Sequence, residues 1–332
     1  MNYEEKMPLI SIITLSYNNI DKIYMTIDSV IAQDYGYIEY IIADDCSKYF
    51  PRNEIEDYLT IRAPNLKFKI YQQNENVGTV KNINKAYKLA SGEYFINLSC
   101  GDIFTSKHTV RDIVNRFFYT SANVLVCSRI KYDSNYKLVC MLPHYKEREI
   151  IKQYNNSHCL YKKFILGEFR DAASGSAMYF SRKIIEEYNY FDESYRLWED
   201  GPFIAKYLRN NDFEIAYDII SIFYADGGVS SSWKKIRSSS LYDDTIKFWK
   251  REFMICINDL DVRERKLLEY RLKRYEVSNL GDLLKLYISS IPQVLHYLRN
   301  SHQRKLFEKQ DKKILSDSNN ANLGIDMSVL KN

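Results

Sequence analysis

The chain has 332 residues, of which 45% are hydrophobic and 27% charged, and its formal net charge is +4. This composition is typical of a folded globular protein, and it excludes a fully disordered, a collagen-like or a polytopic membrane chain. The small net charge and the scattered aromatic residues also argue against a nucleic-acid partner.

The first 130 residues alternate between predicted strands and predicted helices. Short apolar, β-branched runs predict strands buried in a parallel sheet, and apolar residues at helical spacing predict the helices between them. Such a βαβ rhythm indicates an α/β nucleotide-binding architecture. The predicted strands are 9–17, 37–43, 66–72, 93–98 and 124–130, and the predicted helices are 22–33, 55–62, 79–89 and 109–118, with Gly92 ending the helix 79–89.

Beyond residue 130 the pattern first blurs and then becomes mostly helical. Residues 131–171 show no clear period. The segment 172–180 is rich in small residues and then strand-like, and the last third reads as amphipathic helices. The remaining predicted elements are helices at 182–188, 198–210, 241–257, 262–277 and 280–307, the last interrupted by Pro292, and a strand at 215–224.

Polar clusters follow three of the predicted strands. They are Asn18–Asn19, Asp44–Asp45 and Gly101–Asp102. Ligands of open α/β sheets bind beyond the carboxyl ends of the strands. We therefore expect these clusters to converge on one binding site.

Five short motifs follow one another along the first two thirds of the chain. They are Ile10–Asn18, Asp44–Ser47, Asn76–Asn82, Gly92–Asp102 and Trp198–Asp200. Taken together and in this order, they resemble the family 2 glycosyltransferases of the bacterial surface-polysaccharide type. The resemblance covers roughly residues 8–233 and implies a GT-A fold, an α/β architecture with a mostly parallel mixed central sheet flanked by helices.

The extent of this resemblance, together with the charge and composition of the remaining residues, divides the chain into three parts. Residues 1–233 are predicted to form the GT-A domain, 234–315 a basic helical extension, and 316–332 a polar, disordered tail. Residues 234–313 carry 19 Lys and Arg against 11 Asp and Glu. This basic part has two open interpretations, a patch for a membrane surface or a solvated face that covers the core or pairs with a second subunit.

The resemblance implies a pocket for a nucleotide-diphosphate sugar donor. In it Asp45 accepts a hydrogen bond from the nucleobase, Asp44 lies near the ribose, and Lys81 replaces the usual Arg as a point charge. The chain has Asp-Asp-Cys-Ser where the family usually has Asp-Asp-Gly-Ser. The alternative is an acidic turn after a strand and a solvated lysine. The predicted nucleotide-binding residues are Tyr17, Asn18, Asp44, Asp45, Gly78 and Lys81.

The metal motif departs most from the family pattern. The usual Asp-x-Asp is reduced to Ser99–Asp102, in which only Asp102 keeps a carboxylate. Mg²⁺ or Mn²⁺ can be held by one carboxylate, phosphate oxygens and water, whereas Cys100 is a soft ligand. Asp102 is the predicted metal ligand; the alternative is that it only caps a loop. A late glycine-rich loop, Asp226–Ser230, resembles one that closes over the diphosphate.

Catalysis is assigned by the resemblance to the acidic pair at a predicted helix start. Asp200 matches the family's base, which takes the proton of the acceptor hydroxyl, and Glu199 would orient the acceptor. Gly175 and Ser176 are expected to line the donor and acceptor cleft, and Trp198 to stack on a sugar ring. The alternatives are helix capping by the acidic pair, a tight packing turn at residue 175, and a core tryptophan.

The resemblance implies an inverting, hexosyltransferase-type enzyme. It would move a sugar from a nucleotide-diphosphate donor, expected to be a UDP-sugar, to a hydroxyl of a growing, lipid-linked surface glycan such as a capsule polymer. A catalytically weak sugar-nucleotide-binding partner subunit is the alternative that the reduced metal motif keeps open. A dehydrogenase is disfavoured because no GxGxxG follows the first strand, and a nucleotidyltransferase because that turn lacks glycine.

The predicted location is cytoplasmic, at the inner face of the cell membrane. Six cysteines without a CxxC pair indicate reduced thiols, and the chain has no long apolar run. A homodimer is a further predicted partnership.

Overall fold

The computed structural model describes residues 7–132, 138–154, 157–168, 172–225 and 233–317. The predicted glycine-rich loop at 226–230 and the predicted tail beyond residue 317 lie outside the described residues.

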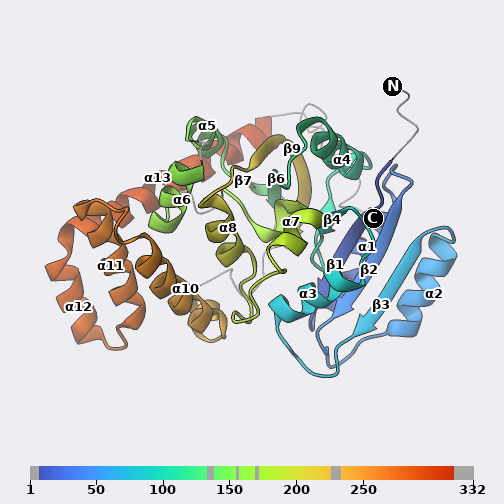
Figure 1. The fold of residues 1–332 in the computed structure, drawn as a ribbon, viewed down its shortest axis with the longest axis horizontal. Helices are drawn as coiled ribbons and strands as arrows, with labels where there is room; N and C mark the ends of the chain where they lie inside the picture. The colour runs from blue at the N-terminus through green and yellow to red at the C-terminus, as the bar shows by residue number, and fades with distance from the viewer. Residues whose placement is uncertain (1–6, 133–137, 155–156, 169–171, 226–232, 318–332) are drawn as a thin grey trace.

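A mixed sheet forms the centre of the molecule (Figure 1). Its strands are β1 (Ile10–Ser16), β2 (Ile38–Asp44), β3 (Lys67–Gln72), β4 (Tyr94–Asn97), β5 (Ile103–Phe104), β6 (Val124–Tyr132), β7 (Leu138–Leu142), β8 (Met178–Ser181) and β9 (Glu214–Ala225). In the described residues the order is β3-β2-β1-β4-β8-β6-β9-β5, with β7 paired to β6. The first four strands are parallel, and β8 enters antiparallel between β4 and β6. The predicted α/β class with a mixed sheet is thus confirmed.

Helices cover the sheet and extend it at one end. They are α1 (Ile23–Ile31), α2 (Arg52–Arg62), α3 (Thr79–Leu89), α4 (Thr109–Thr120), α5 (Tyr145–Gln153), α6 (Ser157–Leu166), α7 (Arg182–Glu187), α8 (Asp200–Leu208), α9 (Trp233–Arg237), α10 (Leu241–Cys256), α11 (Val262–Glu276), α12 (Leu280–Ser289) and α13 (Ile291–Asp317). Figure 1 shows α11 and α12 at the end opposite β3 and α2, with α13 running back toward α5. No helix among the described residues combines the length and apolar character needed to cross a membrane.

The sheet separates two apolar cores because neighbouring side chains of a strand point to opposite faces. On β1, Ile12 belongs to one core and Ile13 to the other. On β2, Ile41 and Ile42 divide in the same way. Strands buried on both faces account for the continuous apolar runs in the sequence.

The helix end predicted at residue 89 is right, but the role predicted for Gly92 is wrong. Gly92 does not end α3, which stops at Leu89; instead, a Cβ on Gly92 would lie 2.5 Å from the backbone nitrogen of Ser11. Glycine is therefore needed there for a close approach. The interruption predicted within 280–307 is present: the helix breaks at Ser290, between α12 and α13, and Pro292 lies in the first turn of α13, where its missing N–H costs nothing.

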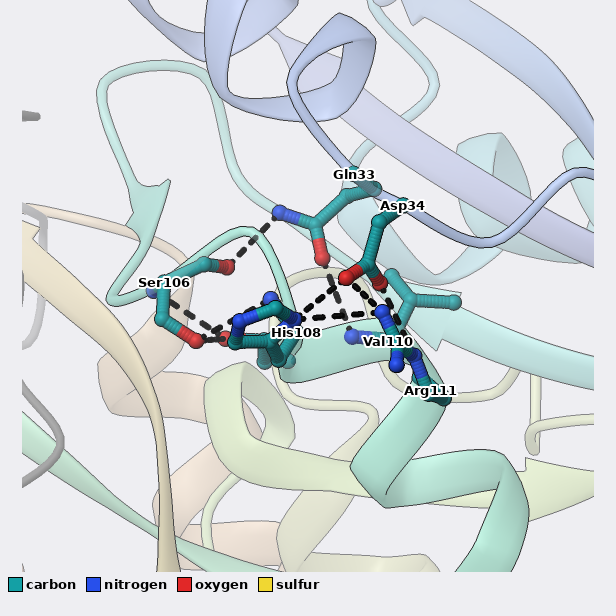
Figure 2. Close-up of polar contacts among 7 residues, drawn as sticks. Gln33, Asp34, Ser106, His108, Val110 and Arg111 are labelled. Atoms are coloured by element: carbon teal, nitrogen blue, oxygen red, sulfur yellow. Dashed lines mark hydrogen bonds and ion pairs between the residues drawn. The ribbon is translucent and has the colours of Figure 1, made fainter.

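The segment after β5 is fixed to α1 by a polar cluster (Figure 2). The Gln33 side chain donates to the carbonyl of Ser106 at 2.9 Å and accepts from the N–H of Val110 at 3.0 Å. Asp34 accepts from Arg111 and contacts His108. These contacts hold the N-terminus of α4 against the end of α1.

The C-terminal helices share contacts with the body rather than forming a separate core. Phe248 and Trp249 of α10 belong to the same apolar core as α3 and α8. At the far end of α13, Leu315 is buried with Ile130 and Met141. The boundary predicted at residue 233 therefore does not separate two hydrophobic cores, and the domain division stays a prediction.

Candidate functional site

The loops after β1, β2 and β4 meet at the carboxyl edge of the parallel strands. The N–H of Asn18 donates to Oγ of Ser47 at 2.8 Å, which joins the first two loops. The Asn19 side chain donates to the carbonyl of Cys100 at 3.0 Å, which joins the first loop to the last. The loops that carry the three predicted polar clusters thus meet at this edge, as expected for a ligand site of an open sheet.

Asp44 is completely buried, and both oxygens of its carboxylate accept two hydrogen bonds each. Oδ1 accepts from the hydroxyls of Ser16 and Ser47, and Oδ2 accepts from the N–H of Ser47 at 2.7 Å and from Gln72 at 2.9 Å. An ionised carboxylate has about four acceptor positions, so these four bonds saturate it. This geometry indicates that Asp44 braces the turn after β2 against the ends of β1 and β3 rather than contacting a ribose directly.

Asp45 joins this turn to the start of α3. Its two oxygens accept from the N–H groups of Val77 and Gly78, each at 2.9 Å. Burial raises the pKa of Asp45 above its ordinary value, while the two backbone donors and nearby Arg196 oppose the rise. Each oxygen keeps an acceptor position for a further donor.

Gly78 lets the segment before α8 approach the start of α3. Its φ is +89°, and a Cβ there would lie 2.5 Å from the carbonyl oxygen of Arg196. That oxygen accepts from the N–H of Val80 at 3.2 Å, and the Arg196 guanidinium donates to the carbonyl of Asn76 at 2.8 Å. The predicted nucleotide motif and the predicted catalytic segment are therefore in direct contact.

The remaining predicted nucleotide-binding residues lie on the open side of this edge. The side chains of Tyr17, Asn18 and Lys81 are exposed. The Asn18 amide oxygen accepts from the N–H of Lys48 at 3.0 Å.

Asp102 offers little support for a metal on its own. It is 8% exposed, and the described residues contain no group of three or more His, Cys, Asp or Glu placed to hold an ion. Cys100 is buried, with its Sγ directed to the carbonyl of Asn19 at 3.2 Å. These residues fit a divalent cation only if phosphate oxygens and water complete its oxygen shell.

The predicted catalytic pair begins α8 and faces the short 3₁₀ turn Gly175–Ala177. Oδ2 of Asp200 accepts from the N–H of Gly175 at 2.7 Å, and its Oδ1 accepts from the N–H of Gly201 at 2.7 Å. A Cβ on Gly175 would lie 3.0 Å from Oε1 of Glu199 and 3.3 Å from Oδ2 of Asp200. The structure thus brings Gly175, Glu199 and Asp200 together.

Glu199 differs electrostatically from an ordinary surface carboxylate. Burial, followed by the neighbouring charges of Asp200 and Asp244, raises the pKa of Glu199 to about 8. A carboxyl that keeps its proton at neutral pH can donate a hydrogen bond but cannot accept a proton. The two neighbours are therefore suited to different tasks, Glu199 as a donor and Asp200 as the candidate base.

Trp198 and Ser176 are placed less directly. The Trp198 ring packs on Phe248 with centroids 4.7 Å apart and covers Gly201, where a Cβ would lie 2.3 Å from the indole. Its main contacts are those of a packing residue, and its sugar-stacking role stays a prediction. Ser176 is half-buried, and its hydroxyl is 3.3 Å from that of Ser174.

Sequence reasoning missed Arg196 and Asp244. Arg196 bonds to Asn76, and the Asp244 carboxylate accepts from the N–H groups of Arg196 and Leu197. No local motif marks either residue, because Asp244 lies 48 residues from its partner in a charged amphipathic helix.

Comparisons with known proteins find glycosyltransferases. The family model "Glycosyl transferase family 2" matches residues 11–188, more than half of the chain. Bacillus subtilis TuaG, whose name assigns it to teichuronic acid biosynthesis, is 37% identical over 95 residues, which are 29% of this chain and 36% of TuaG. The matched stretch thus spans little more than a third of that relative.

Two solved structures share the fold across most of the chain. S. aureus TarS 1-349 in complex with UDP-GlcNAc has a TM-score of 0.57 at 18% identity, covering 95% of this chain and 92% of TarS 1-349. The mannosyltransferase PcManGT of Pyrobaculum calidifontis, in complex with GDP-Man and Mn²⁺, has a TM-score of 0.57 at 13% identity, covering 94% and 86%. On the family match and this shared GT-A fold, the chain belongs to glycosyl transferase family 2.

Proposed function

We propose that the protein is an inverting glycosyltransferase that moves a sugar from a UDP-sugar to a hydroxyl of a growing, lipid-linked surface glycan. The close approach of Gly78 to Arg196 carries this proposal. It places the strand ends that would hold a nucleotide beside the segment that leads into Glu199 and Asp200. A donor bound at that edge would present its sugar toward the carboxyl pair.

The reaction follows from the two carboxyl groups. Asp200 takes the proton of the acceptor hydroxyl as that oxygen forms a bond to the anomeric carbon. The bond from this carbon to the diphosphate oxygen breaks, and the nucleoside diphosphate leaves with the electron pair. A single displacement inverts the anomeric centre. Protonated Glu199 donates a hydrogen bond that orients the acceptor, and the Gly175 N–H holds the Asp200 carboxylate in place.

The leaving diphosphate needs positive charge beside it. A divalent cation bound with the donor would rest on Asp102 and supply charge neutralisation. The PcManGT complex with Mn²⁺ supports a metal only by shared fold. Lys81, exposed at the start of α3, is a further candidate for this charge.

Nucleotide binding tests the proposal most directly. Calorimetry with UDP, GDP, CDP and dTDP, each with and without Mn²⁺, is expected to show tightest binding of UDP and loss of the Mn²⁺ effect in Asp102→Ala. UDP binding together with turnover that Asp200→Asn abolishes supports the transferase. Binding without turnover, unchanged in Asp200→Asn, supports the partner-subunit alternative.

The outer face of α12 and α13 fits the membrane surface on which a lipid-linked acceptor would lie. Leu280, Leu284 and Ile288 recur on one face of α12, and Ile291, Leu295 and Leu298 recur on one face of α13; each is more than half exposed. The same face of α13 continues into the exposed lysines Lys305, Lys309 and Lys313. An apolar stripe with a basic continuation suits an anionic lipid surface.

Co-sedimentation with vesicles tests this surface. The full chain is expected to bind vesicles that contain phosphatidylglycerol and not vesicles of phosphatidylcholine alone. Leu284→Ser with Leu295→Ser should abolish binding, whereas Ile61→Ser with Phe118→Ser, at exposed sites of α2 and α4, should not. Equal binding by both double variants would contradict the assignment, and concentration-dependent self-association of the full chain would instead favour the predicted homodimer. The peripheral location at the inner face of the cell membrane and a role in capsule or cell-envelope synthesis follow from this proposal.

A further inference from the structure

A helix beyond the predicted GT-A domain holds the segment that carries the candidate catalytic pair. Asp244, on the first turn of α10, is 5% exposed. Its Oδ1 and Oδ2 each lie 3.0 Å from the N–H of Arg196, and Oδ2 accepts from the N–H of Leu197 at 2.6 Å. These N–H groups precede α8, so no helical or strand partner serves them. A buried carboxylate that accepts backbone N–H groups in this way fixes both the position and the direction of the chain.

A second contact of α10 lies one helical turn further on. Phe248 packs against the Trp198 ring, which in turn covers Gly201 at the first turn of α8. Asp244 and Phe248 are four residues apart and therefore share one face of α10. Together they fix the segment on both sides of Leu197, two residues before Glu199.

The negative charge of Asp244 also affects the pKa of Glu199. The charged groups that raise this pKa are Asp200 on α8 and Asp244 on α10, and the charge of Glu199 in turn raises the pKa of Tyr87 on α3. The negative charge of Asp244 disfavours ionisation of Glu199. Asp244 thus acts on the pair through the backbone and through its field.

We propose that Asp244 is a positioning residue for sugar transfer, whose carboxylate holds Arg196 and Leu197 so that Glu199 and Asp200 face Gly175. This inference rests on the proposed function. It also predicts that the C-terminal helices are needed for turnover and not only for attachment. A reacting centre tolerates only positional errors well below about 1 Å. Loss of the Asp244 contacts should therefore lower turnover more than donor binding.

The test compares Asp244→Asn with Asp243→Asn. Both remove one negative charge from the same turn, but Asp243 is exposed. Asp244→Asn is expected to lower kcat about tenfold to hundredfold while the calorimetric Kd for UDP changes less than twofold. The fall in activity at alkaline pH should also begin at a lower pH, because the field that disfavours Glu199 ionisation is weaker. Asp243→Asn should match the wild type in all three measurements.

If Asp244→Asn does not fold, Phe248→Leu tests the same positioning role. Phe248→Leu loosens Trp198 without changing any charge, and it should lower kcat without moving the alkaline fall. The proposal is overturned if Asp244→Asn matches Asp243→Asn in kcat and pH profile, or if UDP affinity falls by the same factor as turnover.

The turnover of Asp200→Asn separates a failure of the proposed function from a failure of the positioning role of Asp244. If Asp200→Asn keeps wild-type turnover, the proposed function fails. If Asp200→Asn is inactive and Asp244→Asn behaves like Asp243→Asn, only the positioning role fails.

Discussion

Cys46 has a backbone conformation that its side chain disfavours. Its φ is +64°, in the left-handed region, where a residue with a Cβ is strained by about 1–2 kcal/mol. This is the position at which the resembled family usually has glycine. The Asp-Asp-Cys-Ser motif therefore keeps the turn and retains strain at it.

We expect Cys46→Gly to stabilise the fold by about 0.5–1 kcal/mol, because relief of the left-handed strain exceeds the entropy that glycine adds to the unfolded chain. Urea unfolding measures the difference. Cys159→Gly is the matched control: it lies inside α6, where glycine should instead cost about 1 kcal/mol. A destabilised Cys46→Gly would mean that contacts of the thiol outweigh the strain.

Glu199 gives the site a predicted pH dependence. With a pKa raised to about 8, it holds its proton at neutral pH and loses it as the pH rises through that value. In the proposed mechanism, ionised Glu199 would no longer donate a hydrogen bond to the acceptor and would place a second negative charge beside Asp200. Turnover should therefore fall as the pH rises through about 8.

Glu199→Gln separates this role from that of a base. The amide is a neutral donor at every pH, so the variant should keep turnover within about tenfold and lose the alkaline fall. The pH dependence of kcat for the two proteins checks this. If Glu199→Gln is as inactive as Asp200→Asn at every pH, then Glu199 is itself the base.

At the scale of elements, Arg271 of α11 joins three helices. Its guanidinium donates to the carbonyls of Ile165 at 2.8 Å and Leu166 at 3.0 Å, which end α6. It also lies 4.3 Å from the ring centroid of Trp249 on α10. Gly167 has a φ of +73°, and a Cβ there would collide with this guanidinium. A planar fork and a flat ring contact both require arginine rather than lysine.

Arg271→Lys is expected to cost about 1–3 kcal/mol of folding free energy, because one ammonium cannot serve two carbonyls and stack on the indole. Arg274→Lys, at an exposed position of the same helix, should change stability by less than about 0.5 kcal/mol. Chemical denaturation of both variants decides the matter. Equal stabilities would show that the α6 end is held by other contacts.

At the scale of the whole molecule, the end of α13 closes back onto the body. Nδ1 of His144 lies 2.7 Å from Oδ2 of Asp311, and the N–H of Tyr145 donates to Oδ1 of the same aspartate at 3.2 Å. His144 is 4% exposed and Asp311 1% exposed. A pair 167 residues apart in sequence thus fastens the last helix to the segment between β7 and α5.

Asp311→Ala should destabilise the whole fold by about 2–4 kcal/mol, because it leaves His144 and an N–H group buried without their acceptor. Asp282→Ala on α12, where the side chain is exposed, should have little effect. Thermal unfolding followed by circular dichroism is a suitable measurement. A separate early transition, rather than one lower midpoint, would show that α13 unfolds independently of the sheet.

Several elements could be predicted from local pattern alone. The helix Thr79–Leu89 forms at its predicted bounds, because Val80, Ile83 and Tyr87 give it a clear apolar face. The segment 131–171 could not, since α5 buries only Glu147 and Ile151, and a charged residue is not expected at a core position. β5 has two residues, too few for any period.

The sequence by itself determined the order of the motifs, the α/β rhythm and the strand ends at which the site forms, because these depend on neighbours a few residues apart. Only the tertiary structure decided which donors Asp44 and Asp45 each bind, that β8 enters antiparallel beside β4, and that Asp244 accepts from the N–H of Arg196. Those outcomes depend on which distant N–H groups lie near a buried carboxylate once the chain is packed. A buried acceptor must find a donor, and the packing of the whole chain selects which one.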